Sequence, residues 1–110
     1  MDINKTDVAT LVICKNQSVE EFFVDFSKKY SIFKNENLII DLSDVKGVKT
    51  ESVLLFLQAS KDHRKDGMSF VVVVNGINTD VLPSDFITVP TIVEANDIIE
   101  MENIERDLGF

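Results

Sequence analysis

Asp41 and Asp44 are the carboxylates of this chain that come closest to a catalytic arrangement. Asp41 lies near the end of the largely apolar run 38–42, which predicts a buried strand, and Ser43 and Asp44 follow that run in a polar turn. Small α/β domains place functional residues at this end of their strands. An aspartyl-phosphate enzyme needs a further carboxylate two positions after its nucleophile to help hold magnesium, and Ser43 occupies that position. We therefore expect both aspartates to act as turn or N-cap residues.

His63 and Cys14 represent the two residue types most used in nucleophilic and metal catalysis, and each type occurs once. His63 lies in a charged segment at the end of a predicted helix, so we expect it at the surface. Cys14 lies within an apolar run and has no activating neighbour. A zinc site needs several His, Cys or carboxylate ligands, and one histidine cannot build the histidine-rich two-zinc site of a ribonuclease Z. The glycines are not clustered into a phosphate loop. We expect no enzyme activity, no metal and no cofactor.

The elements that position these residues follow from hydrophobic periodicity. A helix begins after the capping box Ser18–Glu21, another spans about 50–65, and a third follows the capping box Thr91–Glu94. Between 75 and 85 we expect at most a short, irregular helix. Strands are predicted at 2–5, 8–15, 38–42, 70–74 and 86–89. The order β(β)αβαβ(α)βα predicts one α/β domain over residues 1–110, with a mainly parallel central sheet flanked by helices.

Two of the predicted helices carry groups of side chains whose role can be interpreted in more than one way. The first has an aromatic stripe that belongs to the core or, alternatively, to a ligand cage: Val19, Phe22, Phe23, Phe26 and Tyr30. The last has apolar residues available for packing: Ile92, Ala95, Ile98 or Ile99, Met101 and Ile104. Its outward face is acidic: Glu94, Asp97, Glu100, Glu102, Glu105 and Asp107. That face is a solvated surface or a docking surface for a basic partner.

Charge and composition exclude some partners and compartments. The formal net charge of −8 argues against nucleic acid, because phosphate-backbone binding needs a concentrated basic face. The basic clusters Lys28-Lys29 and 61–65 lie in the last turns of predicted helices, where cations complement the helix dipole. No apolar run is long enough to span a membrane, and the first residues do not resemble a signal peptide. With a single cysteine, we expect a reduced, cytoplasmic setting.

The segment after the second strong strand resembles a known family. Asp41-Leu42-Ser43-x-Val45, followed by the apolar Val48 and then Lys49-Thr50-Glu51-Ser52-Val53, is similar to the pattern of the STAS domain of sulfate transporters and anti-sigma-factor antagonists. In that family the second part reads Asp-Ser-Ser/Thr-Gly-Leu. Val89-Pro90-Thr91, with Glu94-Ala95, resembles the family's last strand-to-helix junction. The resemblance spans nearly the whole chain and implies a STAS-like fold.

The resemblance also implies a function. In STAS antagonists a partner kinase phosphorylates a hydroxyl at the start of this helix, and the corresponding residue here is Thr50, with Ser52 and Ser43 as lesser acceptors. It implies a protein partner, either a kinase or a sigma-regulatory protein, that binds what we call the strand-end surface: Ser43, Asp44, Lys49, Thr50, Glu51 and Ser52. The alternatives are that Thr50 is only the N-cap of its helix, that the same loop binds a small ligand or nucleotide, or that the chain is a degenerate enzyme.

Overall fold

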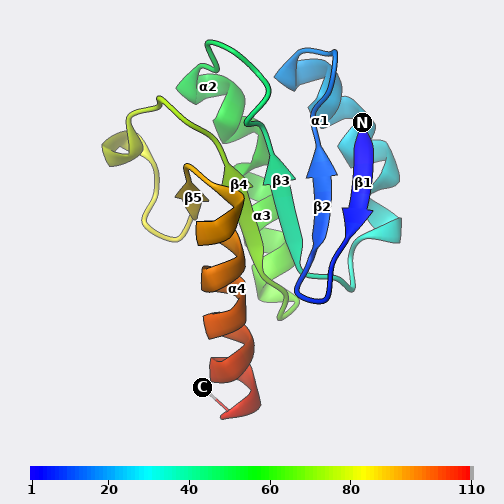
Figure 1. Ribbon diagram of the computed structural model, residues 1–110, viewed down its shortest axis with the longest axis vertical. Helices are drawn as coiled ribbons and strands as arrows, with labels where there is room; N and C mark the ends of the chain where they lie inside the picture. The colour runs from blue at the N-terminus through cyan, green and yellow to red at the C-terminus, as the bar shows by residue number, and fades with distance from the viewer. Residues whose placement is uncertain (110) are drawn as a thin grey trace.

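The computed structural model describes residues 1–109, and a five-stranded sheet forms its centre (Figure 1). The strands are β1 (Asp2–Lys5), β2 (Thr10–Ile13), β3 (Leu38–Asp41), β4 (Phe70–Val73) and β5 (Thr88–Val89). They lie side by side in chain order. β1 pairs antiparallel with β2, and all the other pairs are parallel. The expected α/β fold with a mainly parallel sheet is confirmed.

Helices cover both faces of this sheet. They are α1 (Val19–Lys29), η1 (Tyr30–Ile32), α2 (Thr50–Val53), η2 (Leu54–Phe56), α3 (Leu57–Lys65), η3 (Thr79–Val81) and α4 (Ile92–Asp107). Because neighbouring parallel strands are joined by right-handed crossovers in one direction, α1 and the α2–α3 segment lie on one face. α4 lies on the opposite face, in front of β4 in Figure 1. The helix expected over 50–65 is interrupted by the 3₁₀ turn η2.

The larger core lies under α1 and the α2–α3 segment. Phe26 is at its centre, with ring centroids 5.9 Å from Phe33, 5.7 Å from Phe56 and 6.2 Å from Phe70. The capping box of Ser18 and Glu21 starts α1 as predicted and directs its aromatic side toward the sheet. Val19, Phe22 and Phe26 of the aromatic stripe are therefore core, and Phe23 and Tyr30 pack against it while staying partly exposed.

His63 is buried in this core and not at the surface, so that prediction was wrong. His63 is 0% exposed, and its ring lies edge-on to both Tyr30 of η1 and Phe70 of β4. The physical reason is helical spacing, because Val53, Phe56, Ser60 and His63 follow one another at intervals of three and four and are all buried. The neighbouring charges Lys61 and Lys65 are exposed, as expected of a helix end.

The second core lies under α4 and is smaller. Ala95 and Ile99 are fully buried against β3 and β4. Met101 and Ile104 are mostly exposed, so the expectation that they pack was wrong. Glu102, expected on the outward face, points inward instead, and its carboxylate accepts a hydrogen bond of 3.0 Å from Arg64.

The segment between β4 and β5 has the expected irregular form. It contains the single 3₁₀ turn η3, started by Asn78, whose side chain accepts from the backbone N–H of Asp80. The strand expected over 86–89 is shortened to β5, and Phe86 packs into the larger core. Across residues 1–109, none of the helices is both long and apolar enough to cross a bilayer.

Candidate functional site

Asp41 fixes the turn at the end of β3. Its Oδ1 atom accepts hydrogen bonds from the backbone N–H of Ser43 at 2.9 Å and from the Ser43 hydroxyl at 2.6 Å. The aspartate is 5% exposed, whereas Ser43 and Asp44 are exposed to solvent. Such side-chain-to-backbone bonds stabilise a turn directly after a strand. Asp41 therefore has the turn role predicted for it, and it orients Ser43.

The helix that follows begins one residue earlier than the N-cap interpretation of Thr50 required. Lys49 is the N-cap, with extended backbone angles, and its carbonyl accepts from the N–H groups of Ser52 and Val53. No side chain caps this end. Thr50 is thus the first helical residue, and the prediction that its hydroxyl caps the helix was wrong. Its side chain is half-buried and makes no capping hydrogen bond.

A shallow hollow of about 300 Å³ lies between the start of α1 and the start of α2. The loop 45–49 supplies much of its lining, and Gly47, at φ +65°, allows the chain to turn there. Of the strand-end surface, Lys49 and Ser52 line this hollow. Ser43, Asp44 and Glu51 are exposed outside its lining. The predicted residues therefore share one edge of the domain without converging on a single cavity.

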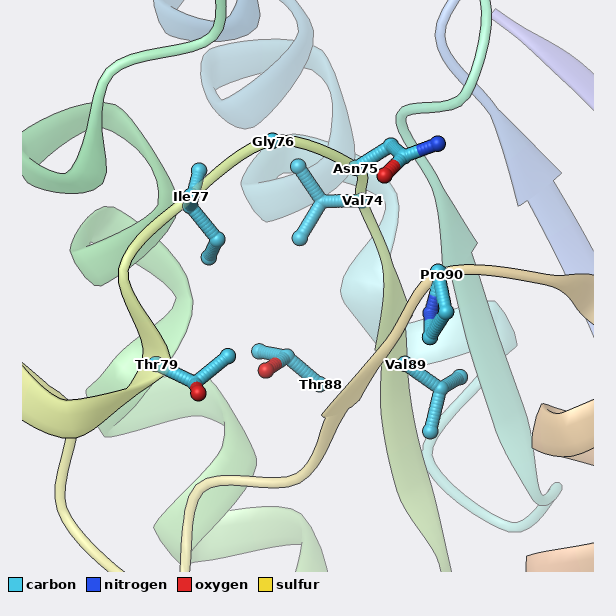
Figure 2. A pocket seen from close by; sticks show the side chains of 8 residues that line it. All are labelled: Val74, Asn75, Gly76, Ile77, Thr79, Thr88, Val89 and Pro90. Carbon is cyan, nitrogen blue, oxygen red and sulfur yellow. The ribbon is translucent and has the colours of Figure 1, made fainter.

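A second hollow, of about 200 Å³, lies at the ends of β4 and β5 and was not anticipated from the sequence. Figure 2 shows the side chains of Val74, Ile77, Thr79 and Thr88 directed into it, while Asn75 points away. Gly76, at φ +78°, lets the chain turn sharply after β4. That glycine, three residues after the end of β4 at the same edge as the predicted site, was the sequence signal that could have indicated this hollow.

The two hollows differ in the chemical groups that line them. The β4–β5 hollow offers hydroxyl and amide groups and no titratable side chain. The other hollow contains Glu20, Lys46 and Lys49, with no histidine or cysteine to act near neutral pH. Over residues 1–109, no three His, Cys, Asp or Glu side chains come together in a way that could hold a metal ion.

Neither Cys14 nor His63 lines either hollow. Cys14 is 1% exposed, and burial raises the pKa of its thiol, which disfavours the reactive thiolate. His63 donates from Nε2 to the Glu36 carbonyl at 2.6 Å and accepts at Nδ1 from the Tyr30 hydroxyl. Both ring nitrogens are occupied, so the imidazole has a structural role in the core.

Comparison with known proteins adds no assignment. No family model matches the chain, and no curated protein is significantly similar to it. What stands is a small α/β domain with a mixed five-stranded sheet. Any function must therefore be argued from the residues themselves.

Proposed function

We propose that this chain is a non-enzymatic, cytoplasmic protein-interaction module that resembles a STAS-type anti-sigma-factor antagonist. The strand-end surface is its docking face, and the partner is a kinase or a sigma-regulatory protein. The order of elements agrees with the STAS pattern over the described chain, and this agreement supports the proposal. The partner would bind side chains at the carboxyl edge of the sheet, where α/β domains present functional groups.

One observation carries the proposal: the loop after β3 presents exposed polar side chains on a fixed backbone. The buried Asp41 ties down its first turn, and Val45 and Val48 pack against the larger core. Asp44 and Lys49 remain exposed on this anchored loop. A preorganised surface loses less conformational entropy when a partner binds. Loops held in this way by a rigid scaffold commonly carry recognition.

We further propose that phosphorylation of Thr50 regulates this docking. A phosphate adds a charge of about −1.5 to −2, directly between Lys49 and Glu51. Lys49 would attract it and Glu51 would repel it, so the surface charge changes strongly at little cost to the fold. The Ser43 hydroxyl is already donated to Asp41, so Ser43 is a weaker acceptor. Ser52 is half-buried like Thr50 and remains the lesser candidate that the resemblance implies.

Charge reversal on the docking face tests the proposal. Immobilised wild-type protein and the variants Asp44→Lys and Lys49→Glu would be used to capture proteins from an extract of the native cell. Ser31→Glu is the matched control, because Ser31 is exposed in η1, at the opposite end of α1 from the strand-end surface. The proposal expects a protein that wild type and Ser31→Glu retain and both reversal variants lose. A partner captured equally by all four proteins would contradict it.

A small-ligand or nucleotide binder is the second candidate, and the hollows of about 200 and 300 Å³ at the strand ends favour it. A nucleotide that binds only the folded state raises the melting temperature, and the rise grows with the logarithm of its concentration above the Kd. Under this alternative, Thr88→Val, which removes a hydroxyl directed into the β4–β5 hollow (Figure 2), reduces that rise. No rise with any nucleotide at millimolar concentration would leave the interaction module as the better account.

A further inference from the structure

The helix α4 is apolar on two opposite sides, and only one of them serves the fold. The inner side buries Ala95 and Ile99 against the sheet. The outer side carries four large apolar side chains that are each between 59% and 69% exposed. We call these four residues the outer stripe: Val93, Met101, Ile104 and Leu108.

The outer stripe runs along one face of the helix, with Asp97 between Val93 and the contiguous Met101, Ile104 and Leu108. Val93, Asp97, Met101, Ile104 and Leu108 follow one another at intervals of four, four, three and four residues. At about 100° per residue, these positions fall within about 80° of arc around the helix. Scattered exposed apolar residues are ordinary, but a contiguous exposed strip marks an interaction surface.

Carboxylates line both sides of the outer stripe. At helical spacing, Glu94 and Glu105 flank it on one side, Glu100 and Asp107 flank it on the other, and Asp97 lies within it. These acidic side chains are exposed. An apolar strip with acidic borders is electrostatically complementary to a basic amphipathic segment.

The single basic residue of α4 does not offset this charge. Arg106 points inward, where its Nη2 atom donates to Asn37 Oδ1 at 3.2 Å and to Ser69 Oγ at 3.1 Å. Arg64, on α3, is likewise engaged with Glu102. The surroundings of the outer stripe on its own helix are therefore entirely negative.

We propose that the outer stripe docks a basic amphipathic segment of another protein. The partner's apolar side chains, spaced three and four residues apart, would pack on Met101, Ile104 and Leu108, and its Lys and Arg side chains would meet the acidic borders. A second copy of this chain is disfavoured as the occupant, because two such stripes would bring carboxylates against carboxylates in either orientation. An anionic membrane is disfavoured for the same reason.

This surface is separate from the one in the proposed function. α4 covers the opposite face of the sheet from α1, and in Figure 1 it runs away from α2 toward the other end of the domain. Its docking of a basic segment therefore does not depend on the strand-end surface. Either proposal can fail without the other.

Fluorescence anisotropy with a designed probe tests the inference. The probe is a labelled helical peptide of about 18 residues, with Leu at intervals of three and four and Lys elsewhere. Wild type would bind it, and Met101→Ser combined with Ile104→Ser would weaken binding at least about tenfold. Ile32→Ser is the matched control, because Ile32 is 61% exposed in η1 and lies off α4. It would bind as wild type does.

Charge variants and alternative occupants complete the test. Glu100→Lys with Glu105→Lys would weaken binding and reduce its dependence on salt. Absence of binding, equal binding of a scrambled peptide, or binding unchanged by the serine pair would overturn the inference. The inference would also be overturned if sedimentation showed a homodimer that Met101→Ser with Ile104→Ser dissociates. Attachment to phosphatidylcholine vesicles that the same double variant abolishes would overturn it too.

Discussion

The Tyr30 hydroxyl donates a hydrogen bond to Nδ1 of His63, with 2.6 Å between the two atoms. The Glu36 carbonyl can only accept, so Nε2 of His63 carries the ring proton and Nδ1 is the acceptor. Burial raises the pKa of Tyr30, which keeps its hydroxyl protonated and able to donate. A neutral imidazole with both nitrogens satisfied thus links η1 to α3 in the larger core.

Tyr30→Phe would remove this donor and leave Nδ1 of a buried ring without a partner. An unsatisfied buried acceptor costs about 1–3 kcal/mol, so we expect the free energy of unfolding in urea to fall by about that amount at pH 7.5. Ser31→Ala, at an exposed neighbouring position, would change it by less than about 0.5 kcal/mol. Equal stability of Tyr30→Phe and wild type would refute the assigned hydrogen bond.

Stability would also depend on pH through His63. Burial lowers the pKa of His63 in the folded protein, so the unfolded chain binds its proton more readily. The stabilising contribution is complete above the ordinary value of about 6.5 and is lost as pH falls from there toward the lowered pKa. We expect the free energy of unfolding to drop between pH 7.5 and pH 5.5.

The control for this pH effect is His63→Gln, which removes the titrating group. Glu36 has a lowered pKa, owing to its hydrogen bonds from Thr10 and Lys5, and so affects stability only in more acidic solution. In His63→Gln the free energy of unfolding would no longer drop between pH 7.5 and pH 5.5, even if the variant is less stable at every pH. A slope that persists in the variant would assign the effect to another group.

Asp41→Ala would release the turn after β3. It removes the acceptor of both Ser43 hydrogen bonds, and bonds to a charged group contribute about 1.5–3 kcal/mol each. We expect a loss of at least about 1 kcal/mol in urea unfolding. Asp41→Asn retains an oxygen acceptor at the same place, so its free energy of unfolding would fall clearly less than that of Asp41→Ala. Equal losses in the two variants would show that the negative charge, and not the turn geometry, is what matters.

Cys14 would resist thiol reagents in the native protein. It is buried, and its thiol pKa is raised, so both access and thiolate fraction are low. We expect slow labelling by a disulfide reagent at pH 8 in buffer and full labelling in denaturing urea. Fast labelling of the native protein would show that the larger core opens at β2.

The sequence predicted the fold better than it predicted individual side chains. Capping boxes and apolar runs identified α1, β3 and β4 because local chemistry and burial agree there. His63 was predicted at the surface because its neighbours are charged, although its spacing from Phe56 places it on the buried side of the helix. The inner side of α4 was ambiguous because apolar residues occur on two opposite sides, so periodicity alone cannot tell which one packs.

The candidate site was predicted only in part. Asp41 was correctly interpreted as a turn residue, whereas the strand-end surface as a binding site stays a prediction. The N-cap was misassigned by one position, because whether Lys49 is extended depends on how the loop 45–49 packs and not on its own type. The β4–β5 hollow depends on how η3 folds back over β5, which no local pattern specifies.

Capture from native-cell extract with Thr50 variants tests the central claim most directly. Thr50→Glu, Thr50→Ala and Ser31→Glu would be compared with wild type, each with its melting temperature measured. The account predicts that one specific partner is retained by wild type, Thr50→Ala and Ser31→Glu and is lost with Thr50→Glu, while all four melting temperatures agree closely. Retention of every captured protein by Thr50→Glu, at unchanged stability, would contradict the account.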